Sequence, residues 1–189
     1  MNKTAIDYKN IYYPPGGILM WIIIFLELIT FGMALIAFAY YGSQEPEIFH
    51  LSKLNPTIGA INTLFLLTSG LFMANAVHFY KEGNINKTTL FFKLAMLGGF
   101  LFLCLKSYEY YTKIIHGITL DTNTFYSFYW MLTGFHIIHV LIGLVILFLT
   151  ERSIVKNKSE LEDVEASATF WHMCDIIWLL LFPILYLIF

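Results

Sequence analysis

The sequence predicts an all-α fold, a polytopic membrane protein built as a bundle of five transmembrane helices. Only 13% of the 189 residues are charged and 58% are hydrophobic, whereas soluble domains carry about 25% charged residues. The apolar residues gather in five stretches of about 20 to 25 residues, each sufficient to cross a ~30 Å hydrocarbon core at 1.5 Å per helical residue. None of these stretches carries a polar face at helical period, which argues against the buried helices of a soluble bundle.

The helices are expected one after another along the chain. Residues 1–16 are polar and lack an apolar signal-peptide core, so we expect a cytoplasmic N-terminal tail. Residues 17–189 are expected to form a single membrane domain, with helices over residues 17–41, 56–80, 90–111, 125–149 and 168–189. The most charged connection, residues 151–165, is expected to begin as a loop and to end as a helical lead-in.

The distribution of Lys and Arg residues predicts the orientation of the bundle. Eight of the eleven fall in the N-terminal tail and in the second and fourth connections: Lys3, Lys9, Lys81, Lys87, Lys93, Arg152, Lys156 and Lys158. The remaining three, Lys53, Lys106 and Lys113, are assigned to the first and third connections. Because cytoplasmic loops carry the excess of positive residues, we expect the N-terminus in the cytoplasm and the C-terminus outside.

Glu27 is an acidic residue within the first apolar stretch, about 15 Å deep at 1.5 Å per residue. A charge at such a depth costs several kcal/mol, so the side chain is expected to be paired or, more often, neutral. A proton-related role is the functional interpretation, and a helix–helix hydrogen bond is the structural one.

His136 and His139 lie three residues apart in the fourth stretch and therefore share a helix face. One hypothesis is haem ligation, with a second ligand supplied by another helix, from His78, His116 or His172. Hydrogen bonding between helices is the alternative.

The fifth stretch places His172, Asp175 and Trp178 along one stripe, and the histidine and aspartate could share a hydrogen bond. A metal needs three or four converging ligands, and no further dense cluster accompanies this pair. Cys104 and Cys174 lie in separate apolar runs, so we expect no metal site. Glu109 ends the third stretch in an aromatic girdle, where we expect it to be solvated. No catalytic motif is found, and the net charge of −2 does not indicate nucleic-acid binding.

Several of these segments, taken in order, resemble subunit III of the haem-copper cytochrome oxidases. The most specific are FYSFYWMLTGFHIIHVLIGLVIL, residues 125–147, and EASATFWHMCDIIWLLLFPILYLIF, residues 165–189. SYEYY and HFYKEG are similar to the family's endings of two other helices, and Glu27 falls at the family's lone buried glutamate, with Leu26 in place of the preceding serine. The resemblance covers residues 16–189. Long family members have seven helices, and this chain is similar to the short, five-helix bacterial form without the first two.

The resemblance implies a non-redox accessory subunit with no catalytic centre and no cofactor of its own, haem and copper being held by partner subunits. It implies packing on subunit I, contact with subunit II and other respiratory subunits, and bound phospholipid. It further implies support of proton uptake and catalytic lifetime in the bacterial cytoplasmic membrane. By position, the polar framework and lipid cleft would include His78, Glu82, Glu109, His136, His139, Glu165, His172, Asp175 and Trp178.

Three alternatives stay open at this point. The short form also occurs as an accessory protein of nitric oxide reductases. A b-type cytochrome membrane anchor would use His136 or His139 as a haem ligand. An independent transporter or proton channel would be built around Glu27.

Overall fold

The computed structural model describes residues 14–52 and 54–188, and within these ranges the chain is helical, with no strand. The helices are α1 (Ile18–Gln44), α2 (Pro46–Leu51), α3 (Pro56–Lys81), α4 (Ile85–Ile115), α5 (Thr124–Val155) and α6 (Leu161–Tyr186). Five of them, all except the short α2, are long and apolar enough to cross a membrane. This confirms the predicted five-helix membrane bundle.

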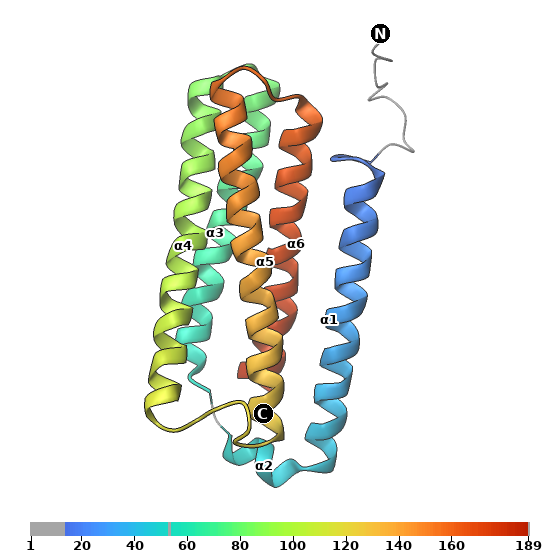
Figure 1. Cartoon of the computed structure of the whole chain (residues 1–189), viewed down its shortest axis with the longest axis vertical. Coiled ribbons are helices and arrows are strands. Elements are labelled where there is room, and N and C mark those ends of the chain that lie inside the picture. Colours follow the sequence, from blue (N-terminus) through green and yellow to red (C-terminus); the bar gives the residue numbers. More distant parts are fainter. Residues whose placement is uncertain (1–13, 53, 189) are drawn as a thin grey trace.

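Helices α3, α4, α5 and α6 form the body of the bundle, and α1 lies at its side against α5 and α6 (Figure 1). The helix α2 turns the chain at the far end, between α1 and α3. The start of α1 and the end of α6 lie at opposite ends of the bundle (Figure 1), as an odd number of crossings requires.

Polar side chains define where most of the helices begin. The side chains of Asn55, Asn84 and Asn123 accept a hydrogen bond from a backbone N–H in the first turn of α3, α4 and α5 respectively. Helix α6 begins with a capping box between Glu160 and Asp163. Such caps satisfy N–H groups that have no partner within the helix.

The helices continue beyond the apolar stretches, so several predicted boundaries were wrong. Helix α4 begins five residues before and ends four residues after the predicted range of 90–111, and α5 continues to Val155 instead of 149. Helix α6 begins at Leu161 rather than 168, so the connection predicted at 151–165 is reduced to residues 156–160. Asn157 in this connection has a left-handed backbone conformation, with φ at 52°, which is incompatible with a continuous helix. The predictions followed hydropathy, whereas the starts of α4, α5 and α6 follow capping side chains outside the apolar region.

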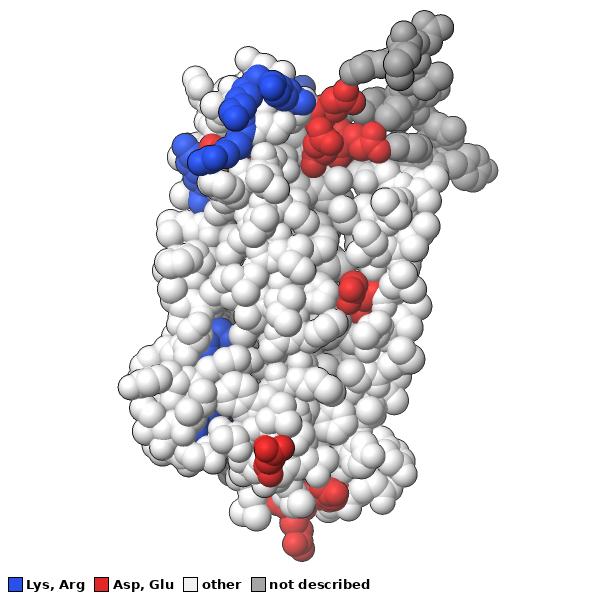
Figure 2. Space-filling model, viewed as in Figure 1, with Lys and Arg blue, Asp and Glu red and all other residues white. Residues whose placement is uncertain are grey.

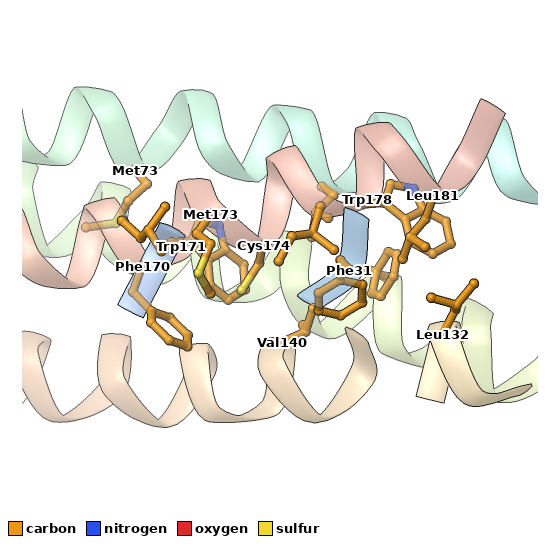
Figure 3. Packing of buried hydrophobic residues seen from close by; sticks show 14 of the residues in the cluster. Phe31, Met73, Leu132, Val140, Phe170, Trp171, Met173, Cys174, Trp178 and Leu181 are labelled. Carbon is orange, nitrogen blue, oxygen red and sulfur yellow. The ribbon is translucent and has the colours of Figure 1, made fainter. Parts of the chain in front are cut away.

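The core is packed around two tryptophans of α6, Trp171 and Trp178, both fully buried. Figure 3 shows these rings among Phe31, Met73, Val140 and other apolar side chains from the neighbouring helices. Gly99 and Gly143 border the Trp171 ring so closely that a Cβ atom would lie within 2.5 and 2.9 Å of it. A glycine at each of these points leaves room for the Trp171 ring, and Gly143 lies where α5 packs against α6.

Charged residues concentrate at the ends of the bundle, and most visible Lys and Arg side chains lie at the N-terminal end (Figure 2). Of the eight Lys and Arg residues in the described ranges, six lie in the turns and helix ends on that side: Lys81, Lys87, Lys93, Arg152, Lys156 and Lys158. Lys106 and Lys113 lie in the other half, and Lys3, Lys9 and Lys53 fall outside the described residues.

Candidate functional site

The acidic residue of the first helix meets a histidine of the fifth at the seam between α1 and α5. Glu27 Oε2 lies 3.2 Å from His139 Nε2, with 26% of the Glu27 side chain and 9% of the His139 side chain exposed. The rings of Phe31 and Phe135 pack against the imidazole at centroid distances of 5.6 and 5.0 Å. Glu27 is therefore paired, which is one of the two states, paired or neutral, that its depth led us to expect.

The second ring nitrogen of His139 restricts how a proton can be held in this pair. Nδ1 lies 2.8 Å from the carbonyl oxygen of Phe135. Because a carbonyl only accepts, Nδ1 carries a hydrogen and donates it. Nε2 then either accepts from a neutral Glu27 or donates, as an imidazolium, to a Glu27 carboxylate. The Glu27–His139 pair can thus hold one proton on either partner without rearranging.

His136 does not join this pair, although it lies one turn away on α5. Its ring is fully buried, stacks on Trp178 at 5.3 Å and meets the edge-on ring of Phe102 at 5.6 Å. Neither ring nitrogen has a hydrogen-bond partner among residues 14–52 and 54–188. The interhelical hydrogen bond considered from the sequence is therefore absent from His136 in the described chain and present in His139.

A second charged group lies in the half of the bundle that contains the C-terminus. Lys106 Nζ is fully buried and donates to Glu109 Oε2 at 2.9 Å, Tyr186 Oη at 2.6 Å and Tyr129 Oη at 3.2 Å. The Tyr186 hydroxyl in turn donates to Glu109. The expectation that Glu109 is solvated was wrong, because it is only 2% exposed and is paired. Lys106, assigned to a connection, lies inside α4.

A third polar group joins α6 to α3. His172 Nδ1 lies 3.3 Å from Asp175 Oδ2, as their spacing predicted, and the Asp175 carboxylate lies directly against Gly70 of α3. Trp178 donates to Thr63 Oγ1 at 2.9 Å. His172 also borders a groove of about 270 Å³ between α3 and α6, which Lys81 and Glu165 line as well.

Ion pairs at the N-terminal end complete the polar framework. Lys81 Nζ lies 2.8 Å from Glu165 Oε1, and His78 Nε2 lies 3.3 Å from Glu82 Oε1. No group of three or more His, Cys, Asp or Glu side chains within the described ranges could hold a metal ion.

Comparison with known proteins decides the family. The family model of cytochrome c oxidase subunit III matches residues 10–188. The chain belongs to the cytochrome c oxidase subunit III family. It is 37% identical over 142 residues to cytochrome c oxidase subunit 3 of Anopheles gambiae, a match that covers 72% of this chain and 52% of the relative. The chain thus spans about half the length of that relative.

Bacterial members of the cytochrome c oxidase subunit III family match over more of their length. A protein of Mycobacterium leprae named probable cytochrome c oxidase subunit 3 is 30% identical over 164 residues, covering 84% of this chain and 78% of the relative. Cytochrome bo(3) ubiquinol oxidase subunit 3 of Buchnera aphidicola is 27% identical over 177 residues, covering 89% and 84% respectively. The similarity therefore includes relatives named after two electron donors.

The polar positions predicted from the subunit III resemblance do not converge on one centre. They form separate contacts along the bundle, some within one helix and some between helices, from His78–Glu82 and Glu165 at one end to Glu109 at the other. Sequence reasoning missed Lys106 as a buried partner. Its spacing of three residues from Glu109, inside a long apolar stretch, is the signal that could have revealed the pair.

Proposed function

We propose that this subunit III family member is a non-redox accessory subunit of a haem-copper respiratory oxidase in a bacterial cytoplasmic membrane. In this proposal it packs on subunit I, with subunit II and other respiratory subunits nearby, and it supports proton uptake and catalytic lifetime. The observation that carries the proposal is the Glu27–His139 pair, which can hold a proton about a third of the way along α1 without a redox group.

The surroundings of the two candidate haem ligands support a chain without its own haem. Both nitrogens of His139 already have partners, Glu27 and the Phe135 carbonyl. The faces of the His136 ring are occupied by Trp178 and Phe102. Iron ligation by His139 would break one of its two contacts, and a haem at the fully buried His136 would have to displace the rings packed around it. Both points disfavour the b-type cytochrome alternative.

The orientation proposal, with the N-terminus in the cytoplasm, rests on the six-to-two distribution of described Lys and Arg residues. Glu162 and Asp163 then lie on the cytoplasmic side, in the first turn of α6. Acidic groups near a proton entrance attract cations and raise their local concentration. The groove between Lys81, Glu165 and His172 is the proposed place for a phospholipid head group.

The test compares the purified oxidase complex with and without this subunit over many turnovers and across pH. We expect unchanged haem content and initial rate, fewer turnovers before inactivation, and slower proton uptake at high pH. Parallel assays with oxygen and nitric oxide identify the acceptor of the complex. Loss of the first turnover would reveal a redox or catalytic role, and unchanged lifetime and pH profile would leave only an assembly role.

A matched pair of variants separates the acidic entrance from a general charge effect. Glu162→Gln removes one carboxylate at the proposed cytoplasmic end, and Glu47→Gln removes one from α2 at the opposite end. Only Glu162→Gln should slow proton uptake at high pH. Equal effects of the two variants would contradict a local role for the acidic residues.

A further inference from the structure

A lipid-facing groove of about 290 Å³ lies between α1 and α5, next to the Glu27–His139 pair. Its walls are apolar apart from one hydroxyl, which donates to the carbonyl of Leu26; the lining residues are Thr30, Phe31, Ala34, Met131, Leu132 and Phe135. Its volume is close to the lower limit of about 300 Å³ for small-molecule sites. A compact ring with part of an apolar tail is the size of ligand that this space suits.

The acid–imidazole pair lies beside the groove, one helical turn from its lining residues on α1. Glu27, Thr30 and Ala34 are spaced three and seven residues apart on α1, so they share the edge of the helix that forms one wall. Phe31 and Phe135 line the groove and also pack against the His139 ring. The groove itself is therefore apolar, and the Glu27–His139 pair is the polar group next to it.

The depth of Glu27 restricts the class of ligand that can reach it. Glu27 lies nine residues after Ile18, the first residue of α1, or about 14 Å along the helix axis at 1.5 Å per residue. That position is near the middle of a ~30 Å hydrocarbon core. Phospholipid head groups stay at the interface, so a ligand reaching Glu27 must have a compact, uncharged head that can enter the hydrocarbon.

We propose that this groove binds the head group of an isoprenoid quinol. One quinol hydroxyl donates to Oε1 of Glu27, whose Oε2 contacts His139. The quinol ring packs against Phe31 and Phe135, as aromatic pairs do at centroid distances of about 4.5–7 Å. The tail leaves past Ala34 and Met131, and the flexible methionine adapts to it.

This site goes beyond the accessory role because it concerns a lipid ligand and involves no electron transfer. It is a binding site only, and the quinol enters and leaves chemically unchanged. It is also separate from the phospholipid groove at Lys81 and His172, which lies between α3 and α6.

The test uses the full-length chain in lipid nanodiscs and a decyl-tailed benzoquinol with a diazirine on the first tail methylene. After photolysis, mass spectrometry should place the label within residues 30–34 and 131–135. Unlabelled decyl-benzoquinol should compete, and decanol, which has the tail and a hydroxyl but no ring, should not. Glu27→Leu should weaken the apparent affinity at least tenfold, as expected for a lost hydrogen bond to an acidic group.

Two substitutions on α1 provide the matched comparison. Ala34→Phe fills the groove and should reduce labelling at least tenfold. Ile36→Phe adds a ring at a position that is 72% exposed and should leave labelling unchanged. If Ala34→Phe fails to fold by circular dichroism, Ala34→Leu provides the same test with a smaller side chain.

Three results would overturn the proposal. Label spread evenly over lipid-exposed peptides would mean that no site exists. Equal competition by decanol would mean that the groove holds only an acyl chain. Undiminished labelling in a folded Ala34 variant would place the quinol elsewhere. None of these results alters the lifetime test of the accessory role, because that test does not depend on the groove.

Discussion

Tyr186→Phe is the substitution that tests the buried charged group most directly. It removes only the hydroxyl that accepts from Lys106 Nζ at 2.6 Å and donates to the Glu109 carboxylate at 2.9 Å. A hydrogen bond to a charged group contributes about 1.5–3 kcal/mol. Since two such bonds share one hydroxyl and do not add fully, we expect the free energy of unfolding to fall by about 2–4 kcal/mol.

Substitutions of Lys106 and Glu109 test whether an unpaired buried charge is what destabilises the chain. Lys106→Met leaves the Glu109 carboxylate buried without its cation, and breaking a buried pair costs about 3–5 kcal/mol. The double variant Lys106→Met with Glu109→Leu removes both charges and keeps similar volume. It should therefore be more stable than Lys106→Met alone, because an apolar replacement of a whole buried pair is often neutral.

The measurement is unfolding of the purified chain in mixed micelles, followed by circular dichroism as denaturing detergent increases. Tyr111→Phe is the matched control. Tyr111 lies on α4 close in sequence to Lys106 and Glu109, but its residue is 63% exposed. It should change the free energy of unfolding by less than about 0.5 kcal/mol. The reasoning fails if Tyr186→Phe behaves like Tyr111→Phe, or if the double variant is less stable than Lys106→Met.

Four further outcomes can be checked independently. Gly99→Ala should destabilise the chain by about 1–3 kcal/mol, because its Cβ would lie 2.5 Å from the Trp171 ring. Gly134→Ala, whose Cβ would have its nearest contact at 3.9 Å, should not destabilise it. The thermal unfolding midpoints of the two variants measure the difference. A hydrophobic carbodiimide should label Glu27, which is partly exposed to lipid, and labelling confined to other carboxyls would contradict its accessibility. A reporter fused to the C-terminus should be active only outside the cytoplasm, and cytoplasmic activity would reverse the orientation. The purified chain should show no visible absorbance, whereas one haem per chain, lost in His139→Ala, would overturn the proposed absence of haem.

Hydropathy was sufficient to predict the number and order of the membrane helices. Five apolar stretches became five long helices, because in lipid every backbone group must be satisfied within its own helix. It was not sufficient to predict their ends, since the caps at Asn84 and Asn123 and the capping box at Glu160 lie outside the apolar windows. Capping is a local chemical signal that an average over many residues conceals.

The sequence was sufficient to identify the residues of the candidate site, but not to predict which of them contact one another. The depth of Glu27 identified it as a residue that needs a partner or a proton, and the structure supplies His139. Nothing within the α1 segment points to a histidine more than one hundred residues later. His136 and His139 share a helix face by spacing, yet one turns to Trp178 and the other to Glu27. Only the packing of three helices around α5 separates them.

The buried Lys106 has a consequence for how the chain is made. Helix α4 is synthesised before α6, so the Lys106 ammonium enters the membrane when Tyr186, its shortest contact, has not yet been added. Until the last turn of α6 arrives, Glu109 and Tyr129 are the nearest groups available to it. A chain without the last turn of α6 would keep the Lys106 ammonium in the bilayer without its shortest hydrogen bond.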